Sequence, residues 1–204
     1  MHRFRTLTAA LLLAIALVPS PTWCQHGPTT AASTGSPAEP PAEARQFDFL
    51  LGDWEIELTP KVSGLAAALH GTPRLLGTWK ATRALDGFGV LDEVRLLDEG
   101  GNPVALTQTT RVYDRRAAQW KISALDVYRA NFTRASGQWD ATAAELRTDG
   151  HGTSGDGRPY SSRSRFIAIG PDGFTMVQDR SYDSGENWEE AAITIVAKRL
   201  AGAR

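Results

Sequence analysis

The sequence predicts an all-β fold, an antiparallel up-and-down barrel of nine or ten strands. From Leu75 onward, strand-length segments alternate with turn-forming residues at intervals of roughly ten to fifteen positions, as at Asp86-Gly87 and Pro171-Asp172-Gly173. Most of the tryptophans stand within or at the start of these segments, where aromatic rings pack on a pleated surface. Because the connections are short and closure removes exposed sheet edges, a closed meander is the simplest arrangement.

The first strand is expected within residues 47–58, whose opening reads FDFLLGDWEIE. Trp54, Ile56 and Leu58 alternate with acidic residues, which is the period-two pattern of a half-buried strand. Trp54 then faces the core, and Gly52 allows the close backbone packing that a buried indole needs. We interpret this stretch as the first strand plus a core plug, with its charges solvated on the outer face.

The turn signals delimit the elements that follow. Residues 61–73 carry several alanines and leucines and are expected to form a short helix or an irregular lid after the first strand. A short strand near 129–134 would bring the total to ten. The remaining strands are expected at residues 75–85, 89–97, 104–113, 119–128, 138–148, 159–169, 174–182 and 188–199.

The chain before the barrel divides into a leader and a tether. Arg3 and Arg5 precede a short apolar run and then prolines, which is the pattern of a secretory signal peptide over residues 1–24. Residues 25–45 are rich in Pro, Ser and Thr and have almost no bulky apolar side chains, so a disordered tether is expected there. The folded domain is therefore expected at residues 46–204, enough chain for one core.

The leader predicts a secreted or periplasmic protein. A lipid anchor at Cys24 is the alternative, but residues 21–23 lack the small side chain expected beside a lipidated cysteine. Cleavage after Cys24 removes the only cysteine, so neither a disulfide nor thiol chemistry is expected. Cleavage also takes Arg3 and Arg5 from the 22 basic residues and leaves the 23 acidic ones, so nucleic acid is not an expected partner. No transmembrane segment is expected in the mature chain, and its oligomeric state is left open.

Two separated motifs carry a resemblance to a known architecture. Gly52-Asp53-Trp54 stands on the first expected strand, and Lys198-Arg199 ends the last one. The combination resembles the calycin (lipocalin-type) barrels, in which a basic side chain from the final strand packs over the indole of the first. The resemblance implies that Gly52, Trp54 and Arg199 form a structural signature.

A longer set of motifs points to a narrower group. FDFLLGDWE at residues 47–55, Val112-Tyr113-Asp114, Trp120 and SYDSGENW at residues 181–188 are similar to an uncharacterised family of secreted bacterial domains. Members of that family open with FDF, two hydrophobic residues and G-x-W. The resemblance covers residues 47–199 and implies a calycin-like barrel, but it implies no reaction.

Cofactor and metal chemistry are not expected. The nitrobindins share a Gly-x-Trp opening and ligate haem iron through a histidine near their C-terminal strands, whereas no histidine follows His151 here. No spacing typical of zinc or calcium sites occurs, and no Ser, Cys or Thr has the flanking residues of a catalytic nucleophile. No cofactor, metal ligand or catalytic residue is therefore predicted.

The segment Ser181-x-Asp183-x-Gly185-x-x-Trp188 matches the Asp-box turn of sialidase propellers. One copy cannot build a propeller, because a propeller needs several similar blades. The motif is therefore interpreted as a device that shapes one hairpin.

Several charged residues share strand faces with large apolar ones, which is costly inside a dry core. In a partly wet lumen these side chains would orient a small polar-headed or amphipathic ligand. The candidate ligand-binding residues are Arg111, Asp126, Tyr128, Arg163, Arg165 and Gln178. The sequence leaves open the alternative that these faces point outward, or that the arginines form structural ion pairs with residues such as Glu93 and Asp126.

Three functions are compatible with these observations. The first is non-covalent binding of a small amphipathic or anionic molecule, which needs an open lumen. The second is an interaction module of the cell envelope, which predicts a filled barrel and an exposed apolar patch. The third is an enzyme that uses Glu93 or Asp126 as a general base beside an arginine.

Overall fold

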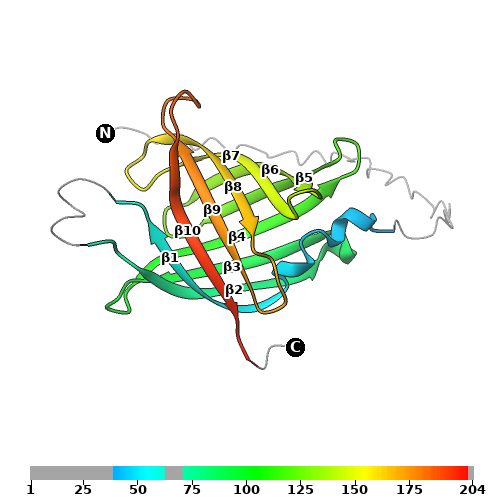
Figure 1. Cartoon of the computed structure of the whole chain (residues 1–204), viewed down its shortest axis with the longest axis horizontal. Helices are drawn as coiled ribbons and strands as arrows, with labels where there is room; N and C mark the ends of the chain where they lie inside the picture. The colour runs from blue at the N-terminus through cyan, green and yellow to red at the C-terminus, as the bar shows by residue number, and fades with distance from the viewer. Residues whose placement is uncertain (1–38, 63–70, 202–204) are drawn as a thin grey trace, which may run out of the picture. The chain divides into compact units, whose positions relative to one another are not determined.

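The computed structural model describes residues 39–62 and 71–201 and contains a closed barrel of ten antiparallel strands (Figure 1). Each strand pairs with its neighbours in the chain, and β1 closes the barrel on β10. The all-β, up-and-down prediction is therefore confirmed. The strands are β1 (Gly52–Pro60), β2 (Leu75–Ala84), β3 (Gly89–Leu97), β4 (Pro103–Asp114), β5 (Gln119–Asp126), β6 (Asn131–Asp140), β7 (Glu145–Thr153), β8 (Pro159–Ile167), β9 (Gly173–Ser181) and β10 (Glu189–Arg199).

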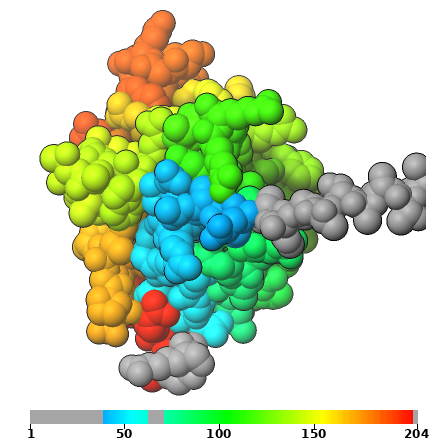
Figure 2. Space-filling model, turned by 90° about the vertical axis from the view of Figure 1, so that its right-hand side faces the viewer, coloured from blue at the N-terminus to red at the C-terminus, as the bar shows by residue number. Residues whose placement is uncertain are grey.

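One end of the barrel is plugged by the chain that precedes β1. Two 3-10 turns, η1 (Ala42–Arg45) and η2 (Asp48–Leu50), bury Phe47 and Leu50 completely. Figure 2 views this end and shows the blue N-terminal atoms filling it, surrounded by the strands. The stretch interpreted as first strand plus core plug therefore divides in two: its beginning forms 3-10 structure inside the barrel, and the strand begins only at Gly52.

The packed region begins earlier than the expected boundary at Gln46. Ala44 is buried, and Arg83 Nη1 donates a hydrogen bond of 3.0 Å to the Ala44 carbonyl oxygen. These contacts place the end of the predicted tether against the barrel. Most of the expected helix or lid after the first strand, residues 63–70, lies outside the described residues. A third 3-10 turn, η3 (Leu85–Gly87), connects β2 to β3.

The strand expected at 138–148 is wrong, because a turn at residues 141–144 divides that range between β6 and β7. In this turn Asp140 Oδ1 accepts hydrogen bonds from the backbone N–H groups of Thr142 and Ala143, and Ala144 has φ of +51°. The same arrangement, an aspartate and, four residues later, an alanine with positive φ, forms the turns at residues 114–118 and 126–130. The prediction missed the turn at 141–144 because its residues are three alanines and a threonine, none of which is a turn signal.

The first and last strands are joined by the indole of Trp54 and the guanidinium of Arg199. Arg199 Cζ lies 4.0 Å from the centroid of the Trp54 ring, and its Nη1 donates a hydrogen bond of 3.0 Å to the Leu51 carbonyl oxygen. Trp54 Nε1 donates to the Leu50 carbonyl oxygen at 2.7 Å. Gly52 has φ of +113°, and a Cβ atom there would lie 2.6 Å from Arg199 Nη1. The basic residue over the indole, which the resemblance to calycin barrels implies, is present in the structure.

An aromatic cluster fills the plugged half of the barrel. Phe47 meets Trp120 edge to face at a centroid distance of 4.7 Å, and Trp54 meets Phe174 at 5.0 Å. Phe166 packs against both Phe47 and Phe174. Because these rings occupy the plugged half, the hydrophobic core lies at one end of the barrel. Within the described ranges, no helix is both long and apolar enough to cross a membrane.

Replacing Gly52 with alanine is expected to destabilise the barrel by about 2 kcal/mol, because the new Cβ both strains a positive-φ backbone and displaces the Arg199 guanidinium. Gly101→Ala is the matched control, since Gly101 also has positive φ but has no atom within 4 Å of the added Cβ. Urea unfolding followed by tryptophan fluorescence measures both variants. Equal losses for the two would show that the contact with Arg199 contributes nothing.

Candidate functional site

The other half of the barrel encloses a cavity of about 440 Å³. One wall is apolar and comes from β10, β1, β2 and β3; it consists of Leu58, Trp79, Val94, Leu96, Ile193 and Ile195. The facing wall comes from β4, β6, β7 and β8 and is rich in hydroxyl groups; it includes Thr107, Thr109, Thr133, Thr148, Tyr160 and Ser164. The cavity therefore presents an apolar face opposite a hydrogen-bonding face.

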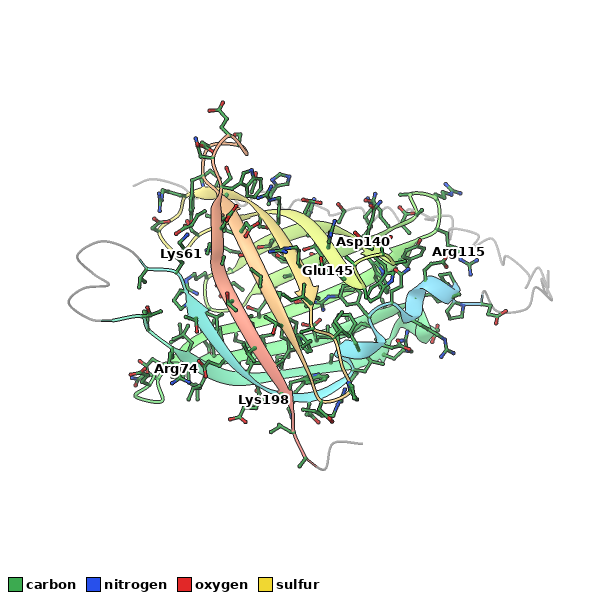
Figure 3. All side chains as sticks on the ribbon, in the orientation of Figure 1. Lys61, Arg74, Arg115, Asp140, Glu145 and Lys198 are labelled. Atoms are coloured by element: carbon green, nitrogen blue, oxygen red, sulfur yellow. The ribbon has the colours of Figure 1, made fainter. Side chains whose placement is uncertain are left out.

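The cavity opens at the end opposite the plug. Its deep residues, such as Trp79 and Phe166, are buried, whereas Arg129 and Gly155 in the turns after β5 and β7 are exposed and also line it. Between these two levels, inward-facing Ala124 and Gln178 are only partly buried. In Figure 3, Arg115 marks the plugged end of the barrel. Lys61, which follows β1, and Arg74, which precedes β2, lie at the opposite end. Within residues 39–62 and 71–201, the cavity is therefore open to solvent past the turns at this end.

A buried ion pair forms the floor of the cavity. Arg111 Nη1 contacts Asp92 Oδ2, and the other Asp92 oxygen accepts a hydrogen bond of 2.9 Å from Trp79 Nε1. The Arg111 guanidinium also lies 5.0 Å from the centroid of the Phe47 ring in the plug. Burial lowers the pKa of Arg111 to about 9, which leaves the side chain charged at pH 7, and the neighbouring carboxylate favours the same charged form. The pair thus links the plug to the cavity.

Two further arginines stand at the open end, and their surroundings differ. Arg129 Nη1 is 2.8 Å from Asp126 Oδ2, so that charge is paired. Arg180 Nε donates to Gln178 Oε1 at 2.8 Å, and Arg180 Cζ lies 4.4 Å from the centroid of the Tyr160 ring. Gln178 in turn donates to Ser164 Oγ at 3.2 Å. Arg180 is therefore oriented by neutral side chains.

The structure brings three of the six predicted ligand-binding residues together. Arg111, Asp126 and Gln178 all line the cavity. Asp126 also accepts hydrogen bonds from the backbone N–H groups of Tyr128 and Arg129, so part of its role is to shape the turn after β5.

The other three predicted residues do not face the cavity. Tyr128 follows the end of β5 and is 53% exposed, because the turn that begins at Asp126 breaks the alternation of the strand. Arg163 lies on the outer face, where its guanidinium carbon is 3.9 Å from the centroid of the Trp188 ring and one nitrogen is 3.3 Å from Asp179. Arg165 is exposed on the same outer face.

A change of direction at the end of β8 explains the error for Arg163 and Arg165. The two arginines were placed inward because they share parity with Ile167 and Ile169. Ala168 has φ of +50° and ends the regular alternation, so Ile169 packs on the core independently of that parity. Within β8 the inward residues are Ser162, Ser164 and Phe166, all of them buried.

Sequence reasoning missed Asp92 and did not include Arg180 among the candidates. Asp92 alternates with Val90 and Val94, a signal that was available for its inward orientation. Arg180 shares the face of Phe174, Met176 and Gln178, and the same parity argument that selected Gln178 applied to it. The hydroxyl-bearing wall was missed because Thr and Ser carry no distinctive periodic signal.

The proposed catalytic carboxylates are not arranged for joint chemistry. Glu93 points outward and its Oε1 is 2.7 Å from Arg95 Nε, which lowers the pKa of Glu93. Asp126 is engaged with its own turn and with Arg129. Among residues 39–62 and 71–201, no group of three or more His, Cys, Asp or Glu side chains could hold a metal ion.

The Asp-box-like turn is a self-contained hydrogen-bond network. Ser181 Oγ donates to Asp183 Oδ1 at 2.7 Å, and Asp183 accepts further bonds from the backbone and side chain of Asn187. These donors lower the pKa of Asp183 to about 2, with the Asn187 backbone N–H as the largest cause. Trp188 Nε1 closes the turn on the Gly185 carbonyl oxygen. The motif has the geometry of the hairpin device that the sequence suggested.

Comparison of the chain with protein-family models and with curated proteins finds no match in either set.

Replacing Arg111 with methionine is expected to destabilise the protein by about 3–5 kcal/mol, because the Asp92 carboxylate remains buried without its countercharge. The double variant Arg111→Met/Asp92→Leu removes both charges and should lose less stability than Arg111→Met alone. Urea unfolding of the wild type, both single variants and the double variant measures the coupling. A double variant as unstable as the sum of the single ones would mean that the two side chains act independently.

Proposed function

We propose that this protein binds a small amphipathic molecule non-covalently inside the open half of its barrel. The observation that carries the proposal is the cavity itself, in which an apolar wall from β10, β1, β2 and β3 faces a hydroxyl-rich wall from β4, β6, β7 and β8. A ligand with one apolar face and one hydrogen-bonding edge would satisfy both walls at once. A purely apolar ligand would leave the hydroxyl groups without partners, which is unfavourable.

The size of the cavity supports a small molecule. Its volume of about 440 Å³ falls within the range of roughly 300–1,000 Å³ typical of small-molecule sites. The aromatic cluster and the Asp92–Arg111 pair support its floor, so the site is largely preformed. Such pre-organisation favours affinity because little ordering remains to be done on binding. The signal-peptide pattern at residues 1–24 supports a ligand met in the periplasm or outside the cell.

The alternative of an interaction module rests on a different feature. The hairpin between β5 and β6 exposes three large apolar side chains, namely Val127, Tyr128 and Phe132, of which Phe132 is 66% exposed. An exposed apolar cluster of this kind can contact another protein. The unfilled lumen favours the ligand-binding proposal over this one.

The direct test is native mass spectrometry of the protein purified without denaturation from the periplasm or culture medium. We expect a species heavier than the bare chain, with the extra mass released as a small molecule on denaturation. Protein found only at the bare chain mass, with no uptake of the neutral amphiphile Nile red, would contradict ligand binding and favour the interaction module.

Filling the cavity from β5 provides a variant test. Ala124 lines the cavity, so Ala124→Phe should block it and weaken Nile red binding at least about tenfold. Ser123→Phe adds the same ring on the exposed outer face of the same strand and should bind Nile red as the wild type does. Fluorescence titration measures both variants, and equal binding by the two would place the dye outside the barrel.

A further inference from the structure

We infer that Arg180 is the anchor for an oxyanion head group, so that the ligand of the proposed cavity is an anionic amphiphile held by its head at the open end. The inference rests on the proposed function, because it assigns the ligand class of that same cavity. It follows from the charges that line the cavity, from the way the guanidinium is held, and from the position of the apolar wall relative to it.

The charges that line the cavity do not balance. Arg111 is paired with Asp92 and Arg129 with Asp126, whereas no carboxylate lies within 4.0 Å of the Arg180 nitrogens in residues 39–62 and 71–201. All 23 acidic side chains of the chain fall within those residues, and Glu189, which faces Arg180 across the β9–β10 ladder, is exposed and forms no ion pair with it. The cavity therefore carries one positive charge in excess. An anionic ligand would neutralise it in surroundings less polar than water, where the attraction between charges is stronger.

The Arg180 guanidinium is positioned but not saturated. Its Nε is bonded to Gln178 Oε1, which Ser164 holds through the other end of the Gln178 amide. The Tyr160 ring supports the guanidinium plane from one side. Among the hydrogen bonds of the described ranges, none uses a terminal nitrogen of Arg180, so Nη1 and Nη2 retain their donors. Two such nitrogens in one plane match the two oxygens of a carboxylate, or two oxygens of a phosphate.

The apolar wall begins directly beside this anchor. Gln178, two residues before Arg180 in β9, pairs with Ile193 across the β9–β10 ladder. Met176 lies on the same inward face, one step deeper in the barrel. From there Ile195 and Trp79 continue the apolar surface toward the floor. A head group on Arg180 would thus place an apolar tail along β10, β1 and β2, with the hydroxyl-bearing wall facing any polar substituent on that tail.

Calorimetric titration with decanoate, decyl phosphate and the neutral amphiphile decanol, each below its aggregation concentration, tests the inference. We expect the wild type to bind at least one of the two anions about tenfold or more tightly than decanol. Preference for decanoate would identify a carboxylate head group, and preference for decyl phosphate a phosphate monoester. Equal binding of all three would overturn the role of Arg180 and leave the cavity proposal standing, whereas binding of none would overturn the cavity proposal itself.

Three variants test whether the preference for an anionic ligand depends on Arg180. Arg180→Gln should lose the preference for the anion while it still binds decanol as the wild type does, which also shows that the barrel is folded. Arg180→Lys keeps the charge but not the paired donors and should keep only part of the preference. Arg163→Gln removes an arginine from the outer face of neighbouring β8 and should bind all three probes like the wild type. An unchanged anion preference in Arg180→Gln would overturn the inference.

Discussion

The contact between Trp54 and Arg199 is the interaction on which the rest of the barrel depends, because it joins the first strand to the last. An up-and-down meander has two free edges until those strands pair, and β1 and β10 meet through a ladder that runs from Trp54 and Arg199 to Pro60 and Ile193. The guanidinium also binds the Leu51 carbonyl oxygen, at the junction of plug and strand. One side chain therefore fixes closure of the sheet and the position of the plug together.

Closure with a plug at one end explains why the molecule has a cavity at the other. The plug and the large aromatic rings of β1, β2, β5, β8 and β9 fill the interior of the plugged half. In the other half of the barrel, the strands carry smaller or polar inward residues, such as Thr109, Ala124 and Ser164, which cannot fill the interior of a ten-stranded barrel. The Asp92–Arg111 pair lies at this boundary. The attraction between the two opposite charges and the donor that Trp79 supplies to Asp92 stabilise the pair in these surroundings of low polarity.

The fold was predictable because period-two alternation and turn chemistry are local signals, and the errors arose where that locality fails. Glycine is typical of turns, yet Gly150 and Gly152 lie within β7, where a Cβ atom would come within 2.9 Å of Ala135 or 2.6 Å of the Tyr160 hydroxyl. Conversely, the turn at 141–144 lacks glycine and depends on the carboxylate of Asp140. The parity argument placed Gln178 inward correctly, but it placed Arg163 inward wrongly, because the left-handed Ala168 interrupts the alternation after β8.

The arginines separate what parity can predict from what it cannot. Parity indicates whether a side chain faces inward, and it placed Arg111 correctly. Whether an inward charge is structural depends on which acid lies beside it on a neighbouring strand, as Asp92 of β3 lies beside Arg111 of β4, and parity within one strand does not show this. Arg111 is paired with Asp92, and Arg129 with Asp126 three residues earlier in its own turn, so both charges have a partner without a ligand. The Arg180 side chain contacts the Gln178 amide and the Tyr160 ring, and Glu189, its partner across the β9–β10 ladder, is exposed and forms no ion pair with it. A neutral residue with the same partners would stabilise the fold about as well as Arg180 does. The positive charge of Arg180 is therefore best explained by an anion that enters the cavity from outside.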